Sequence, residues 1–192
     1  MKRFKLEPLL VALACLGPIV AAYLLYYYGD PSALPRMANE ERTLLEPAVP
    51  LPPLDSGADR EDGEAAGWGP RWSLIYVRTA PCDTTCVEDL ARIAAVHIRL
   101  GRDQPRMRRI YIGPEPEPLA ALDPMLAALP IGTPSYQAFA DALVSAGVPP
   151  AEGGRLYVVD PHGNLVLSYP PRPDQEGLLK DLERLLDASR IG

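Results

Sequence analysis

An apolar run that leads directly into two closely spaced cysteines constrains the fold of this chain more than any other feature. Residues 72–77 have the composition of a short strand that is buried on both faces. Cys82 and Cys86 follow in a C-x-x-x-C spacing, and a helical pattern of apolar residues begins at the same place. A strand–loop–helix unit puts both sulfur atoms at the N-terminus of the helix, where free N–H groups and the helix dipole favour the thiolate.

A cysteine pair in this position has two chemical uses. It can cycle between dithiol and disulfide, or it can hold a soft metal ion such as Cu(I) between two thiolates. A static disulfide is the structural alternative. Because Cys82 is nearer to the helix start, we predict that it is the more nucleophilic thiol and that Cys86 is its resolving or co-ligating partner. Asp83 between them opposes thiolate formation, and Arg78 just before the loop offsets that charge unless both are simply solvated.

The remaining apolar patterns give the order of the elements. After the first strand and its cysteine-bearing helix, they predict a strand, two helices, a β-hairpin and a closing amphipathic helix. Helices on both faces of a small mixed sheet, with the cysteines directly after the first strand, form the thioredoxin-like α/β fold. The predicted ranges after the first strand are 84–100, 107–112, 119–129, 135–146, 156–159, 165–169 and 175–186.

The N-terminus predicts a membrane anchor. Residues 8–28 form an essentially uncharged apolar run of the length that spans a bilayer, and tyrosines close it like an interfacial aromatic belt. A cleaved signal peptide would have a shorter apolar region. Lys2, Arg3 and Lys5 precede the run, so the positive-inside rule places them in the cytoplasm. We therefore assign residues 1–29 to a cytoplasmic tip and transmembrane helix in a bacterial inner membrane, with the soluble domain in the periplasm, where dithiols can be oxidised.

The rest of the chain divides into two parts of different composition. Residues 30–67 are rich in proline and acidic residues and show no periodicity, so we predict a flexible tether. Residues 68–192 carry the strand and helix patterns and are predicted to be the thioredoxin-like domain. The net charge of the chain is −6, and its lysines and arginines form no stripe, which argues against nucleic acid as a partner.

With these features the chain resembles the Sco/SenC family, the membrane-anchored thioredoxin-like proteins that help to assemble the copper centre of cytochrome c oxidase. The resemblance covers roughly residues 68–188, together with the single N-terminal anchor. It is carried by the strand entering Cys82-x-x-x-Cys86, the helix behind it, the hairpin at residues 156–163 and the terminal helix. It implies an accessory role in oxidase biogenesis through the cysteine pair, with Cu(I) as a candidate metal at Cys82 and Cys86. Oxidase subunits or other assembly factors are the implied partners.

One ligand of the family's copper site is missing. That site resembles two cysteines plus a histidine a few residues before the hairpin, whereas residues 148–155 contain no histidine and Glu152 or a neighbour takes its place. A carboxylate is a hard ligand and substitutes poorly for imidazole on Cu(I). His97, about three helical turns beyond Cys86, and His162, in the hairpin turn, are not convincing replacements. Two alternatives therefore stay open: a general periplasmic thiol–disulfide oxidoreductase, and a non-catalytic interaction module.

Overall fold

The computed structural model describes residue 16 and residues 42–54, 68–114, 119 and 123–189. None of the helices in these ranges is both long and apolar enough to cross a membrane. The predicted anchor at residues 1–29 lies outside the described residues except for Leu16, and residues 30–41 and 55–67 of the predicted tether lie outside them too.

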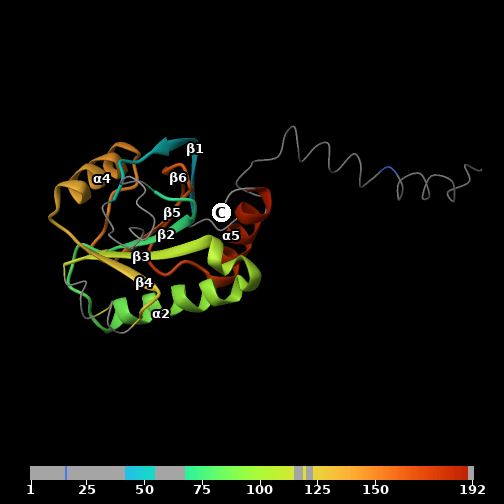
Figure 1. Ribbon diagram of the computed structural model, residues 1–192, viewed down its shortest axis with the longest axis horizontal. Coiled ribbons are helices and arrows are strands. Elements are labelled where there is room, and N and C mark those ends of the chain that lie inside the picture. The colour runs from blue at the N-terminus through green and yellow to red at the C-terminus, as the bar shows by residue number, and fades with distance from the viewer. Residues whose placement is uncertain (1–15, 17–41, 55–67, 115–118, 120–122, 190–192) are drawn as a thin grey trace, which may run out of the picture. The chain divides into compact units, whose positions relative to one another are not determined.

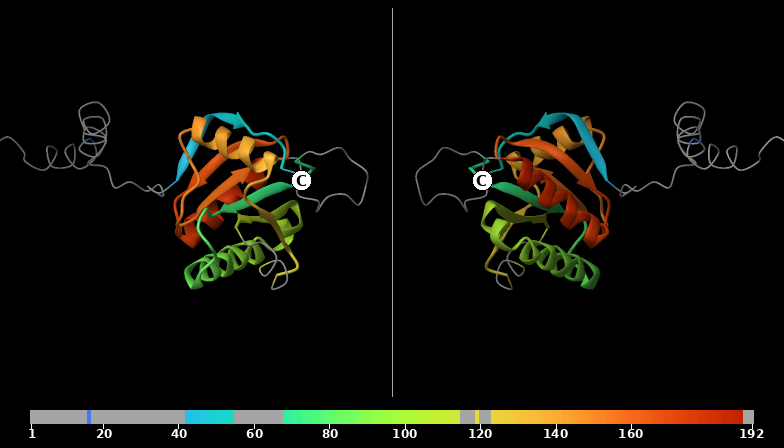
Figure 2. Two further views of the ribbon diagram at one scale, coloured as in Figure 1. Left: turned by 90° about the vertical axis from the view of Figure 1, so that its left-hand side faces the viewer. Right: turned by 90° about the vertical axis from the view of Figure 1, so that its right-hand side faces the viewer.

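A mixed β-sheet forms the centre of the folded part (Figures 1 and 2). Its six strands among the described residues are β1 (Thr43–Pro50), β2 (Trp72–Val77), β3 (Met107–Gly113), β4 (Leu126–Pro130), β5 (Arg155–Val159) and β6 (Asn164–Tyr169). They lie in the order β1-β6-β5-β2-β3-β4. β2, β3 and β4 run parallel to one another, whereas β5, β6 and β1 follow as antiparallel neighbours.

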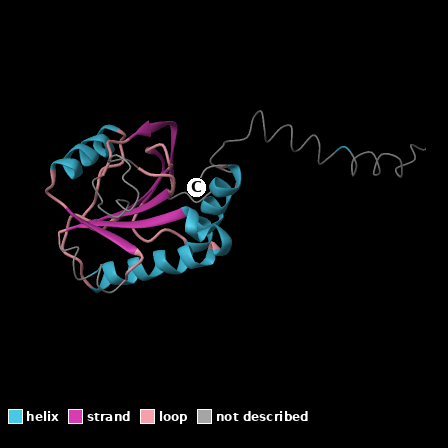
Figure 3. Ribbon diagram, in the orientation of Figure 1, coloured by secondary structure: helices cyan, strands magenta, loops and turns pink. Residues whose placement is uncertain are grey.

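Helices cover both faces of this sheet (Figure 3). On one face α2 (Thr84–Arg99) packs beside α5 (Gln175–Ala188), and on the other lies α4 (Pro134–Ser145). A short 3-10 helix, η3 (Gly101–Arg106), joins α2 to β3. Each of these α-helices begins with a side-chain oxygen that accepts a hydrogen bond from an otherwise unpaired backbone amide. The capping residues are Asp83, Thr133 and Asp174.

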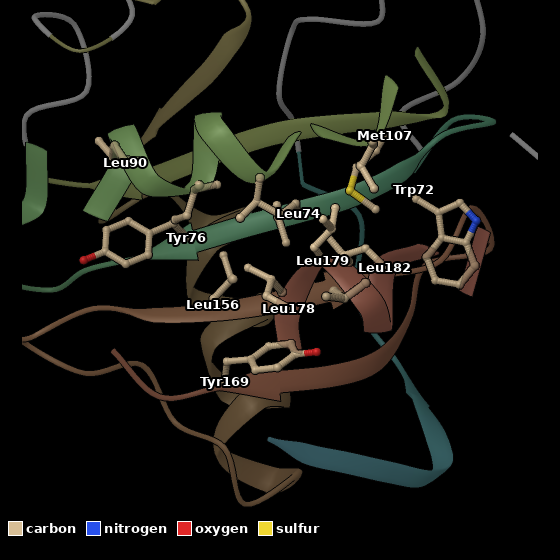
Figure 4. Close-up of a cluster of buried hydrophobic side chains, with 14 of the residues drawn as sticks. Trp72, Leu74, Tyr76, Leu90, Met107, Leu156, Tyr169, Leu178, Leu179 and Leu182 are labelled. Carbon is tan, nitrogen blue, oxygen red and sulfur yellow. The ribbon is translucent and has the colours of Figure 1, made fainter. Parts of the chain in front are cut away.

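Two apolar cores lie on the two faces because successive side chains of a strand point in opposite directions. On the face of α2 and α5, alternate residues of β2 from Trp72 to Tyr76 pack with leucines of α5 (Figure 4). On the other face, Ile75 packs in one cluster with Phe139 and Leu143 of α4. All residues of β2 are buried, as the sequence predicts for a central strand.

Most of the predicted elements are confirmed. The central strand, the helix behind the cysteines, the strand after it, the hairpin and the closing helix lie where the apolar patterns predict them, with ends that differ by at most two residues. These are the elements whose apolar faces are longest and most regular, and their burial in the two cores explains why the periodicity is so clear.

The predicted helix at residues 119–129 is wrong in its second half. Residues 126–130 form β4, which pairs with β3 from Arg109 opposite Leu126 to Gly113 opposite Pro130. The Leu-Ala-Ala-Leu sequence of this segment favours a helix by local propensity. In the folded chain its backbone instead pairs with the N–H and C=O groups on the outer side of β3, and this tertiary pairing outweighs the propensity.

Residues 43–54 lie inside the predicted tether, yet they are structured. β1 pairs with β6, with an irregular register between Leu44 and Val49, and Leu45 is buried in the core on the α4 side. β1 lies at the edge of the described sheet, where a proline such as Pro47 removes no ladder hydrogen bond. The register shift and the prolines erase the alternating pattern that predicts a strand, so the sequence does not predict β1.

Candidate redox site

The cysteine pair lies at the junction of β2 and α2. β2 ends at Val77, the connecting loop carries Cys82, and the helix begins at Thr84. Asp83 is the N-cap residue, and its Oδ1 accepts a hydrogen bond from the backbone amide of Cys86 at 2.9 Å. The two cysteines therefore stand just before and within the first turn of the helix, as their spacing predicts.

Cys82 and Cys86 form a disulfide, with their Cα atoms 5.2 Å apart. The two residues differ in exposure, because Cys86 is fully buried in the core on the face of α2 and α5, whereas Cys82 is half-buried. Disulfide exchange begins with a thiolate attacking a sulfur atom that it can reach. Cys82 is therefore the more accessible cysteine of the pair.

A buried cation lies beside the cysteine loop. Arg78, the first residue after β2, is 6% exposed, and its Nη2 donates a hydrogen bond to Asp83 Oδ2 at 2.8 Å. Burial acts to lower the pKa of Arg78, but the Tyr76 hydroxyl and the Asp83 carboxylate outweigh burial and raise it. The amide of Cys86 and the guanidinium of Arg78 together lower the pKa of Asp83 below its usual value. Both side chains are therefore charged and paired, and Arg78 is not simply solvated.

A second polar pair lies next to Cys86 along α2, and no sequence motif marks it. Asp89 is 3% exposed and accepts a hydrogen bond from the hydroxyl of Tyr76 at 3.1 Å. Burial, and then the neighbouring carboxylate, raise the pKa of Tyr76, so that its hydroxyl remains a donor. Arg172 Nε lies 3.4 Å from the other carboxylate oxygen of Asp89. The one feature of the sequence that points to Asp89 is its spacing of three residues from Cys86, which puts the two side chains on the same face of α2.

The segment before β5 runs beside the cysteine loop. Ala151 forms an isolated parallel bridge with Arg78, and its carbonyl oxygen accepts a hydrogen bond from the amide of Thr79 at 3.3 Å. Glu152, the residue expected near the position of the missing histidine, is exposed in the turn that follows. The main chain of the pre-β5 segment thus lies next to the approach to Cys82.

Neither histidine joins the cysteines. His97 is buried in α2. Its Nε2 donates a hydrogen bond to the carbonyl oxygen of Met107 at 2.8 Å, and this bond connects α2 to β3. Burial lowers the pKa of His97. His162 lies in the turn between β5 and β6. Over the residues that the structure describes, no three His, Cys, Asp or Glu side chains are grouped so that they can hold a metal ion, so these residues do not fit a Cys–Cys–His copper site.

Residues 72–189 match the sequence model of the family described as the transmembrane-like, thioredoxin-like, C-terminal domain. The matched range runs from β2 through the cysteine pair to α5. The chain belongs to this family. Its folded part is therefore a thioredoxin-like α/β domain, as the order of its elements predicts. No curated protein matches the chain.

Solved structures similar to this thioredoxin-like domain share little sequence with it. A DsbF homologue from Corynebacterium diphtheriae is 11% identical at a TM-score of 0.50, with 81% of this chain and 96% of that chain covered. Sco1 from yeast is 15% identical at a TM-score of 0.49, with 64% and 83% covered. ScoI from Arabidopsis thaliana with copper bound is 16% identical at a TM-score of 0.48, with 64% and 88% covered. At 11% identity the likeness to the DsbF homologue shows the fold alone.

Proposed function

We propose that this chain is a thiol–disulfide exchange protein in which Cys82 exchanges with a client and Cys86 closes the internal disulfide. The observation that carries the proposal is the asymmetry of the pair. The sulfur atoms are bonded at the N-terminus of α2, with Cys82 half-buried and Cys86 fully buried. A helix N-terminus stabilises a thiolate, which forms only when the disulfide opens, so this position favours an exchanging pair over a static one.

The exchange balances without any further reactant. A client thiolate attacks Cys82 Sγ, the bond between the two sulfur atoms breaks, and its electron pair leaves on Cys86 Sγ, which then takes up a proton. A second client thiolate attacks the client sulfur of the mixed disulfide and releases Cys82 as a thiolate. The client has been oxidised to a disulfide and the cysteine pair has been reduced. The reverse sequence reduces a client disulfide.

We further propose that the client is a cysteine-bearing subunit or assembly factor of cytochrome c oxidase. The support is the Sco/SenC-like sequence pattern around Cys82 and Cys86 and in the hairpin of β5 and β6. In this proposal residues 1–29 anchor the chain in a bacterial inner membrane, and the thioredoxin-like domain works in the periplasm. A general periplasmic oxidoreductase and a non-catalytic interaction module are the alternatives.

These residues fit the exchange part of a Sco-like role better than the copper part. The reduced pair supplies two thiolates, and no third metal-binding side chain is grouped with them among the described residues. We therefore expect the reduced chain to lose Cu(I) to a strong chelating competitor. A stoichiometric site that resists the competitor and disappears in Cys86→Ser would instead favour copper delivery.

Covalent trapping of the client tests the proposed function. In Cys86→Ser the mixed disulfide between Cys82 and a client cannot be resolved internally, so we expect an adduct that dithiothreitol releases and that contains an oxidase subunit or assembly factor. Cys82→Ser is the matched control, because it also removes the bond but leaves only the buried thiol, and we expect it to trap nothing.

Other outcomes separate the alternatives. Adducts with many unrelated periplasmic proteins would indicate a general oxidoreductase. No adduct with either variant, together with undisturbed oxidase assembly, would contradict thiol–disulfide exchange. If both variants assembled oxidase normally and the chain still bound its partners, the interaction module would be the better interpretation.

A further inference from the structure

Part of a buried cation next to the cysteine loop lacks a partner. Nη2 of Arg78 donates to Asp83, whereas Nε and Nη1 are buried without a hydrogen-bond acceptor among the residues that the structure describes. Burying a guanidinium is costly unless its N–H groups are satisfied, and an unsatisfied group of this kind needs an explanation. Over the described part of the chain, the ion pair recorded for Arg78 is the one from Nη2 to the Asp83 carboxylate.

One carboxylate connects this cation to the start of α2. Asp83 Oδ2 accepts from Arg78 at 2.8 Å, and Asp83 Oδ1 accepts from the amide of Cys86 at 2.9 Å. Both charges therefore lie within the C-x-x-x-C loop and its immediate approach. The side chain of Arg78 is 7% exposed and that of Asp83 is 58% exposed, so water screens the negative charge more than the positive one.

Opening the disulfide creates the missing anion. The sulfur atoms are neutral in the disulfide, but exchange releases one of them as a thiolate. A nearby positive charge stabilises that thiolate and a nearby negative charge destabilises it, whereas neither acts on the neutral disulfide to a comparable extent. Arg78 and Asp83 thus act in opposite directions on the equilibrium between disulfide and dithiol.

We propose that Arg78 is the thiolate-stabilising cation of this site and that Asp83 is its opposing charge, so that the two residues together set the redox equilibrium of the Cys82–Cys86 couple. The unpartnered N–H groups of Arg78 serve the reduced form, in which a sulfur atom carries negative charge. This inference rests on the proposed exchange function and adds to it the residues that determine how readily the pair is reduced.

A purely structural Arg78 would behave differently. The contacts of its backbone, from its amide to Ile112 O and across the bridge to Ala151, do not depend on its side chain. If the side chain only held the loop in place, its loss would lower stability, and neutralising Asp83 as well would add to the damage. If the two charges act in opposite directions, neutralising both should instead restore the wild-type redox equilibrium. The net charge of the two side chains is zero both before and after the double substitution.

The redox equilibrium of the full chain against glutathione, read by alkylation of free thiols, tests the inference. Arg78→Met removes the positive charge at similar length, and Asp83→Asn removes the negative charge but keeps an N-cap oxygen. Since a partly screened charge near a sulfur atom changes thiolate stability by about fivefold, we expect Arg78→Met to favour the disulfide about fivefold. We expect Asp83→Asn to favour the dithiol by a smaller factor, and the double variant to lie within about twofold of wild type.

Two further variants serve as controls. Arg92→Met deletes the same charge from an exposed position farther along α2, and we expect an equilibrium within about twofold of wild type. Arg78→Lys keeps the charge but loses the planar fork, so we expect it to lie between wild type and Arg78→Met. If Arg78→Met does not fold, Arg78→Lys and Asp83→Asn decide the outcome by the direction of their shifts.

The results that would overturn the inference are distinct from those that would overturn the proposed function. A wild-type chain that exchanges with glutathione, while Arg78→Met and Arg92→Met give the same equilibrium, overturns only the role of Arg78. A double variant that favours the disulfide as strongly as Arg78→Met overturns the role of Asp83. A wild-type chain whose cysteines do not exchange at all contradicts the proposed function itself.

Discussion

Reduction of the Cys82–Cys86 disulfide is expected to leave the chain folded and only slightly less stable. The two cysteines are four positions apart, so the bridge closes a ring of five residues. The chain-entropy relation gives about 7 cal/mol/K for a ring of this size, or about 2 kcal/mol at 25 °C, compared with about 4.7 kcal/mol for a 100-residue loop. Cys86 is one of many buried side chains in the core on the face of α2 and α5, and the core on the other face contains neither cysteine.

Urea unfolding of the oxidised and the dithiothreitol-reduced chain measures this difference. We expect both forms to unfold cooperatively, with the reduced form losing about 2 kcal/mol of unfolding free energy. Cys82→Ser is a suitable control because it removes the bond and leaves the buried Cys86 in place, and we expect it to match the reduced wild type. A reduced chain that is unfolded, or that loses about 5 kcal/mol or more, would refute the reasoning and identify the disulfide as a structural crosslink.

Three further predictions concern the scaffold that positions the site. Phe139→Ala, in the core under α4, should lower the unfolding free energy by about 3–5 kcal/mol in urea unfolding, whereas Val144→Ala on the same helix, at a side chain that is 58% exposed, should change it by no more than about 0.5 kcal/mol. Thr133→Ala removes the N-cap acceptor of α4 and should lower the unfolding free energy by about 1 kcal/mol. Thr133→Ser keeps the acceptor and should lose much less, so equal losses in the two variants would contradict a capping role. Burial lowers the pKa of His97 below its ordinary value of 6.5, so the unfolded chain binds a proton that the folded chain does not, and stability should fall as the pH drops below about 6.5. Unfolding curves across that range should show this fall in the wild type but not in His97→Gln, and a fall of the same size in both would rule out His97 as its source.

The sequence predicts the fold best where burial is most regular. The sequence predicts β2 and α5 to within two residues of their ends, because the apolar run of β2 and the leucine stripe of α5 are each buried along a full face. β4 was predicted as a helix, since its alanines and leucines carry no sign of the pairing with β3 that makes them a strand. The sequence does not predict β1, because this edge strand contains prolines and a register shift and so shows no alternation of apolar and polar residues.

The candidate site was predictable only in part, for a similar reason. The C-x-x-x-C spacing at the end of an apolar run locates Cys82 and Cys86 at the helix start without any knowledge of the tertiary structure. The opposite charges of Arg78 and Asp83 could be read from the sequence, but the burial of the guanidinium and its unpartnered nitrogens could not. The bond between Tyr76 and Asp89 joins a strand to a helix, and such contacts depend on how the elements pack.

The reduction potential of the wild-type Cys82–Cys86 couple, measured at equilibrium with glutathione, tests the central claim most directly. Exchange-active pairs in thioredoxin-like proteins have potentials between about −120 and −270 mV, and structural disulfides lie below about −300 mV. We predict a potential within the first range. A value below about −300 mV, or a disulfide that glutathione does not reduce at any ratio, would contradict the claim that this pair exchanges with clients.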